Sequence, residues 1–209
     1  MSAPWIRRTG AAVAAALLPV IGSTLAQQPS PAAGEMPSMA EMMKKAECYT
    51  KPGESHKLLA RLIGTWETET RFTMPGMEAP PEKGTAETSW LMEGRWVKSE
   101  AMGTLMGMPS RSFTIIGYDN MKMSYVVTTV TSLDTAMNRS EGDLDPGGDV
   151  LITFGTIDEY LTGEHDKMVK VVWRFLSDDR MVMEVHDLPI GEHNTKVLEI
   201  AYTRRTARG

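Results

Sequence analysis

The chain has 209 residues, a net charge of −5, 42% hydrophobic residues and one cysteine. This length allows one domain with a real core, and the acidic balance disfavours nucleic acid or anionic lipid as a partner. Because Cys48 is the only cysteine, an internal disulfide is excluded.

Residues 1–26 have the pattern of a secretory signal peptide. Arg7 and Arg8 give a positive start, an apolar run extends from Ala11 to Ile21, and small residues precede Gln27. The apolar run is too short to cross a bilayer, although an uncleaved anchor is the alternative interpretation. We therefore expect a periplasmic or secreted protein with no membrane span after signal cleavage.

Residues 27–53 are rich in proline, small residues and methionine, which predicts a flexible tether with a possible short helix from Met39 to Glu47. The sequence "SHKLLARLIG" then predicts a compact helix at the start of a domain spanning 54–205. Leu58, Leu59 and Leu62 share one face of this helix, and Gly64 ends it. A helix this short must cover an apolar surface.

After Gly64 the hydrophobic pattern has a period of two, which is typical of strands. Ten strand-like runs are separated by turn residues; they span 65–74, 84–93, 95–105, 111–118, 123–132, 137–143, 149–157, 168–177, 180–188 and 195–204. No helical pattern intervenes, so consecutive strands should pair in an antiparallel, up-and-down order. Closure removes exposed edges, and the sequence therefore predicts an all-β, closed antiparallel barrel with a short N-terminal helix.

The two faces of several strands differ in polarity. Lys170 and Arg174 share the outer face of one strand, which places Trp173 inside. Trp90 lies on a mostly small, uncharged face and is also expected inside, as is Thr128. Hydroxyl groups facing inward indicate a hydrated or ligand-accessible lumen, because unpaired hydroxyls in a dry core cost free energy. For a single threonine, a hydrogen bond to a neighbour is the alternative.

Four segments carry a resemblance to a known family: "HKLLARLIGTW", "GTAETSWLMEGRWV", "IIGYDNMKMSYV" and "LEIAYTRR". Together they resemble the bacterial family of domain of unknown function 1579 (DUF1579), over about His56 to Arg205. The resemblance implies a relative of the lipocalin and fatty-acid-binding (calycin) barrels. It also implies that Trp66 closes one end of the barrel beneath the short helix. No established activity comes with this family.

Glu184 and His186 are the strongest candidates for acid–base chemistry. They share one face of the 180–188 strand with Val182 and Leu188, whereas Met181 lies on the opposite face. If the first face is internal, a carboxylate and an imidazole enter the lumen together and can transfer protons. If the methionine face is internal, both are solvated. The sequence leaves the choice of face open.

Metal and cofactor chemistry has weaker support. The 17 methionines include clusters such as Met36, Met39, Met42 and Met43, and thioethers select Cu(I), but methionine is also a flexible apolar filler. Haem is disfavoured because the last strand has no histidine, which leaves only His186 and His193 nearby. No cofactor and no metal site are expected.

The leading prediction is an exported, non-catalytic barrel that binds a small apolar or amphipathic ligand in its lumen. The expected ligand contacts are Trp90, Thr128, Trp173 and His186, with Tyr118 and Tyr125 at the mouth. The first alternative is an enzyme that uses Glu184 and His186 on a lumen-bound substrate. The second is a methionine-rich, copper-handling envelope protein.

Overall fold

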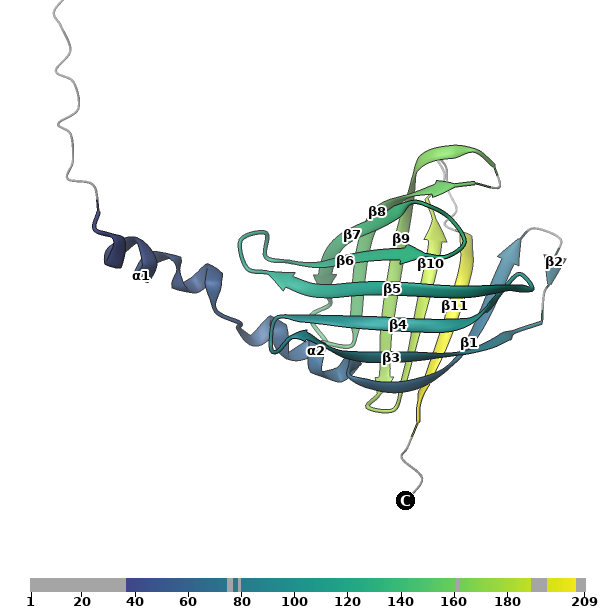
Figure 1. The fold of residues 1–209 in the computed structure, drawn as a ribbon, viewed down its shortest axis with the longest axis horizontal. Coiled ribbons are helices and arrows are strands. Elements are labelled where there is room, and N and C mark those ends of the chain that lie inside the picture. Colours follow the sequence, from purple (N-terminus) through teal and green to yellow (C-terminus); the bar gives the residue numbers. More distant parts are fainter. Residues whose placement is uncertain (1–36, 75–76, 79, 161, 189–194, 206–209) are drawn as a thin grey trace, which may run out of the picture. The chain divides into compact units, whose positions relative to one another are not determined.

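A computed structural model describes residues 37–74, 77–78, 80–160, 162–188 and 195–205. Ten long strands follow one another along the chain (Figure 1): β1 Gly64–Met74, β3 Glu82–Met92, β4 Trp96–Leu105, β5 Met108–Asp119, β6 Ser124–Thr131, β7 Met137–Leu144, β8 Val150–Glu159, β9 Glu164–Ser177, β10 Arg180–Asp187 and β11 Thr195–Arg204. Each pairs antiparallel with the next, and β11 pairs with β1. The predicted ten-stranded, closed up-and-down barrel is confirmed.

A two-residue strand, β2 (Met77–Glu78), pairs only with the end of β1. The predicted signal peptide at 1–26 lies outside the described residues, as does the tether before residue 37.

The tight turns explain why the strands begin and end where they do. Between β7 and β8, the Asp145 carboxylate accepts hydrogen bonds from the backbone N–H groups of Asp149 and Val150, at 2.9 and 2.8 Å. These bonds hold the pKa of Asp145 below its ordinary value, with the Val150 bond contributing most. Asp119 binds the N–H groups of Met121 and Lys122 in the same way between β5 and β6.

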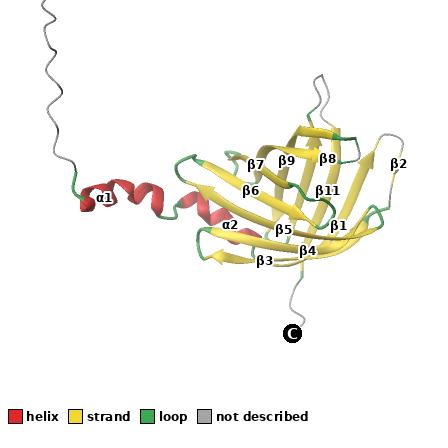
Figure 2. Cartoon of the chain, turned by 45° about the horizontal axis from the view of Figure 1, so that its top comes forward, coloured by secondary structure: helices red, strands yellow, loops and turns green. Residues whose placement is uncertain are grey.

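The helices precede the barrel (Figure 2). The helix expected from Met39 is present and extends to Thr50 as α1, followed by a 3₁₀ turn, η1 (Glu54–His56), and by α2 (Lys57–Leu62). The carbonyl of Tyr49 in the last turn of α1 and that of Lys51, which follows the helix, accept hydrogen bonds from Asn120 in the β5–β6 turn. None of the described helices has the length and apolarity needed to cross a membrane.

Helix α2 fills one end of the barrel with apolar side chains. Leu58, Leu59 and Leu62 are buried against Trp66, which is 1% exposed at the start of β1. The Trp66 indole N–H donates to the Leu62 carbonyl at 3.0 Å, so the tryptophan both packs against the helix and caps its last turn. The predicted role of Trp66 beneath the short helix is therefore confirmed.

Arg204, near the end of β11, locks this arrangement. Its guanidinium lies over the Trp66 ring, 4.1 Å from the centroid. The same group donates to three backbone carbonyls, those of Arg61, Ile63 and Asp178. One cation thus joins the end of α2, the start of β1 and the β9–β10 turn.

Gly64 makes this close approach possible. Its φ of +137° disfavours residues with a side chain, and a Cβ here would lie 2.4 Å from the Arg204 Nη1 atom. The glycine that ends the helix signal in the sequence therefore also leaves space for the arginine.

An aromatic group attaches η1 to the same end of the barrel. The Tyr125 hydroxyl donates to the Ser55 carbonyl at 2.7 Å, and the rings of His56, Tyr118 and Tyr125 pack edge to face. His56 Nδ1 accepts the Gly53 N–H at 3.0 Å, which requires that nitrogen to be unprotonated. Burial, together with the charge of Arg95, lowers the pKa of His56.

We predict that Arg204→Met lowers the free energy of unfolding by about 3 kcal/mol, because it removes the cation over Trp66 and leaves the partly buried carbonyls of Arg61 and Ile63 without their charged donor. Urea denaturation measures the loss. Arg205→Met is the matched control, since Arg205 is exposed and makes only a 3.5 Å contact with Glu67; its expected cost is below about 0.5 kcal/mol. Equal effects of the two variants would contradict the locking role of Arg204.

We also predict an acid-sensitive contribution from His56. The folded protein binds a proton at His56 less readily than the unfolded chain does, so this contribution is complete above about pH 6.5 and declines as the pH falls below that value. His56→Asn keeps an acceptor for the Gly53 N–H but cannot titrate. Urea midpoints between pH 5 and 7.5 should therefore fall less in His56→Asn than in the wild type, while His165→Asn, at an exposed position, should behave as the wild type. Identical pH profiles for all three proteins would refute this role.

Candidate functional site

The inner faces of the strands enclose a cavity of about 560 Å³ in the half of the barrel away from α2. Its rim includes residues next to three loops: Leu105 and Met106 of β4–β5, Asp134 of β6–β7, and Tyr160 of β8–β9. These loops lie opposite the end that α2 closes, because successive loops of an up-and-down barrel alternate between its ends. The barrel is therefore packed in one half and hollow in the other.

Three aromatic residues in contact form the boundary between the two halves. Tyr202 meets Trp66 edge to face at 6.4 Å and stacks on Trp173 at 6.1 Å. Tyr202 and Trp173 are only 9% and 8% exposed, and both line the cavity. Burial raises the pKa of the Tyr202 phenol, so the hydroxyl stays protonated. Within the described residues, Trp173 Nε1 is buried without a hydrogen-bond partner.

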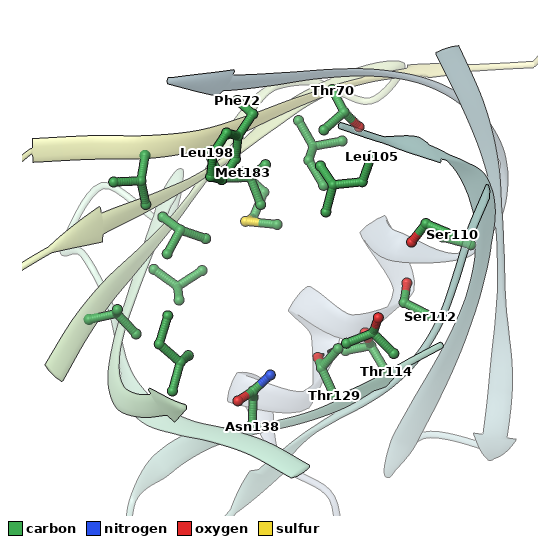
Figure 3. Close-up of a pocket in the computed structure, with 18 of the residues that line it drawn as sticks. Thr70, Phe72, Leu105, Ser110, Ser112, Thr114, Thr129, Asn138, Met183 and Leu198 are labelled. Atoms are coloured by element: carbon green, nitrogen blue, oxygen red, sulfur yellow. Dashed lines mark hydrogen bonds between the residues drawn. The ribbon is translucent and has the colours of Figure 1, made fainter. Parts of the chain in front are cut away.

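One side of the cavity is hydrocarbon. We define the apolar wall as the inward residues of β9, β10 and β11, namely Val169, Val171, Met183, Val185, Leu198 and Ile200. Phe72 of β1 extends it, because Phe72 is paired with Leu198. In Figure 3, Phe72, Leu198 and Met183 lie together on one side of the opening.

The opposite side is polar. We define the hydroxyl wall as the inward residues Ser110, Ser112 and Thr114 of β5, Thr129 of β6 and Asn138 of β7. Figure 3 shows these side chains across the cavity from Met183 and Leu198.

Many inward hydroxyls bind one another across neighbouring strands. The pairs Thr88–Ser99, Thr114–Thr129 and Ser140–Thr153 each have an oxygen–oxygen distance of 2.9 Å. In contrast, the side chains of Ser110, Ser112 and Asn138 form no hydrogen bond to another described residue. The hydroxyl wall therefore presents unused donors and acceptors to the cavity.

Charged groups gather at the mouth. Lys167 and Asp187, on neighbouring strands, form an ion pair of 2.8 Å, and this hydrogen bond raises the pKa of Lys167. The other carboxylate oxygen of Asp187 is buried without a partner among the described residues. Neither the apolar wall nor the hydroxyl wall contains a charged residue.

Of the predicted ligand contacts, the structure places Trp173 in the cavity lining. Trp90, Tyr118 and Tyr125 do not line the cavity; they pack in the filled half beneath η1 and α2. Tyr118 and Tyr125 were expected at the mouth, but they flank the β5–β6 turn, which lies at the closed end. Burial raises the pKa of Tyr125 to about 12, in keeping with its structural hydrogen bond to Ser55.

The prediction that Thr128 faces the lumen is wrong. Thr128 is paired with Ile115 and Arg139, whereas its neighbour Thr129 is bonded to Thr114 inside the barrel. In a regular strand, residues 125 and 128 must point to opposite faces. Because Tyr125 points inward, Thr129 also points inward and Thr128 points outward.

Glu184 and His186 lie on the outer face of β10, because Met181, Met183 and Val185 face inward. Glu184 contacts Arg174 at 3.3 Å, His186 at 3.4 Å and Lys196 at 3.4 Å. Burial opposes ionisation of Glu184, but the His186 hydrogen bond and the two cations outweigh it and hold the pKa below its ordinary value. The pair belongs to a surface ion network and has no access to a lumen-bound substrate.

The metal hypotheses gain no site from the described residues. They contain no group of three or more histidine, cysteine, aspartate or glutamate side chains that could hold a metal ion. Met39, Met42 and Met43 are exposed on α1, so thioether binding of copper stays a hypothesis. For haem, His186 points outward and His193 lies outside the described residues.

Sequence reasoning missed Tyr202 and most of both walls. A signal was available in the last strand, "KVLEIAYTRR", where Leu198, Ile200 and Tyr202 alternate with Glu199 and Thr203. The apolar face of this strand lines the cavity.

Two solved structures are similar to this chain at low sequence identity. Rv2717c from M. tuberculosis has a TM-score of 0.52 at 13% identity, covering 75% of this chain and 100% of that one. The S-type phycobiliprotein lyase CPES from Guillardia theta has a TM-score of 0.49 at 10% identity, covering 82% and 100%. At 13% identity, the likeness to Rv2717c concerns the fold alone. No curated protein matches the sequence.

The family described as "Protein of unknown function (DUF1579)" matches residues 51–204. That span holds η1, α2 and all the strands, including the residues that close the barrel and those that line the cavity. The chain belongs to the DUF1579 family.

Proposed function

We propose that the protein is an exported, non-catalytic carrier that holds one small amphipathic molecule in the open half of its barrel. The cavity supports this proposal, because about 560 Å³ lies within the range of small-molecule sites. Export is inferred from the N-terminal sequence, with its positive start and short apolar run.

The observation that carries the proposal is the contrast between the two walls. An apolar wall next to water is unfavourable, and an apolar guest that covers it gains about 25 cal/mol for each Å² removed from water. The unused groups of Ser110, Ser112 and Asn138 can at the same time bind the polar part of that guest. A dry, filled barrel would have neither feature.

The enzymatic alternative has less support. Its acid–base pair, Glu184 and His186, lies on the outer face. Among the residues that line the cavity, Lys167 and Asp187 are already paired at the mouth. Binding alone accounts for the geometry.

We predict that the neutral dye 1-N-phenylnaphthylamine binds the purified protein and gains fluorescence, because the apolar wall offers it a low-polarity site. Ala101→Phe, which projects a ring into the lumen from β4, should weaken binding at least 10-fold. Thr128→Phe adds the same ring to the outer face and should leave binding unchanged. Circular dichroism confirms folding, and Val171→Phe provides a second block from the opposite wall. A folded protein that binds no dye, or binds it equally well with the lumen filled, would refute the carrier.

We further predict that His186→Ala leaves the dissociation constant of the dye unchanged within about twofold, because His186 points away from the lumen. Trp173→Ala, which removes an indole from the cavity lining, should weaken dye binding. Fluorescence titration of both variants measures the difference. A large loss of dye affinity in folded His186→Ala would indicate that Glu184 and His186 on the outer face form a functional site.

A further inference from the structure

The two walls face each other across the cavity, with polar groups concentrated on one wall and hydrocarbon on the other. Thr68 and Thr70 of β1 add two hydroxyls beside the apolar wall. The hydroxyl wall runs along β5–β7 and faces the apolar wall on β9–β11, as Figure 3 shows for Ser112, Asn138 and Met183. In a site for a head-to-tail amphiphile, such as a fatty acid, polar groups gather at one end of an apolar tunnel. Here a guest meets polar groups along one flank and hydrocarbon along the other.

The free groups of the hydroxyl wall are neutral and both donate and accept hydrogen bonds. Ser110 and Ser112 carry hydroxyls, and Asn138 carries an amide, all without a partner among the described residues. Thr114 and Thr129 are already hydrogen-bonded to each other, so they do not require a hydrogen bond from a guest. The unused groups thus match hydroxyl or carbonyl groups on a guest.

The walls contain no counter-ion for a charged guest. The charges at the mouth include Lys167, which contacts both Asp187 and Glu159. Arg139 also borders the cavity, because it is next to Asn138 in β7, but its guanidinium donates a hydrogen bond to Glu141. A carboxylate or ammonium placed between the walls would therefore lose its hydration without compensation.

We propose that the lumen selects uncharged, facially amphipathic molecules, in which a rigid ring system has hydroxyl or carbonyl groups on one face and hydrocarbon on the other. This inference rests on the proposed carrier function. Ser112 and Asn138 bind the polar face of the guest, and Val171 and Met183 contact its hydrocarbon face. Linear amphiphiles with a charged head bind less well because they leave the hydroxyl wall unpaired.

The test compares two esters with the same skeleton by displacement of 1-N-phenylnaphthylamine. Methyl cholate has three hydroxyls on one face of its steroid ring system, whereas methyl 5β-cholanate has none. The preference ratio, defined as the affinity for the first divided by that for the second, isolates the polar face from general hydrophobicity. Palmitate serves as the linear, charged competitor.

The double variant Ser112→Ala/Asn138→Leu keeps the volume of the site but removes two of the three free polar groups, leaving Ser110. Its preference ratio should fall by about 10-fold, which corresponds to two ordinary hydrogen bonds. Thr128→Val, the same kind of change on the outer face, should keep the wild-type ratio. Wild-type protein should also bind methyl cholate more tightly than palmitate.

The outcomes separate this inference from the carrier function. If the dye binds and Ala101→Phe blocks it, but the double variant keeps the wild-type ratio or palmitate binds best, selection by the hydroxyl wall is overturned and the carrier stands. If the wild-type protein binds neither the dye nor either ester, the carrier function itself fails. If the dye binds and Ala101→Phe blocks it, and the preference ratio falls in the double variant but not in Thr128→Val, both the carrier function and the selection by the hydroxyl wall are supported.

Discussion

The packing of Arg204 over Trp66 is the interaction on which the rest of the structure depends. The guanidinium ties the last strand to the first strand and to the carbonyls at the end of α2, while the indole fills the space beneath the helix. This arrangement concentrates the core in one half of the barrel, where the three leucines of α2 and the η1 aromatic group are buried. Because this half contains the packed core, the other half can remain hollow while β1 and β11 stay paired through both halves.

Inward hydroxyls are compatible with this design because most of them satisfy one another. The Thr88–Ser99 and Ser140–Thr153 pairs lie beside the packed half and replace the hydrogen bonds that water would make. Among the described residues, Ser112 and Asn138 lack such partners and lie where the cavity is open. The cavity wall therefore contains both paired hydroxyls, such as Thr114 and Thr129, and unpaired polar groups that a guest can bind. Paired hydroxyls therefore contribute to packing, whereas unpaired polar groups are available to bind a ligand.

The sequence predicted the barrel well because alternation and turn residues are local signals. Alternation also placed Trp173 inside, whereas the place of Trp66 beneath the helix was implied by the family resemblance. The candidate site was harder to predict. Both faces of β10 contain apolar residues, and only the pairing of β10 with β9 and β11 decides that Met183 faces inward. Thr128 was misplaced by one residue, which in a strand reverses the face. Which end of a closed barrel stays open is a property of the whole fold, and no single strand encodes it.

The central claim is that the half of the barrel beyond Tyr202 is an accessible binding site. A crystal structure of the protein with 1-N-phenylnaphthylamine tests it most directly. We expect density for the dye inside the barrel, between the apolar wall at Val171 and the hydroxyl wall at Ser112, above the Trp173–Tyr202 stack. Density for the dye only on the outer surface, or side chains that fill the space between the two walls, would contradict the account.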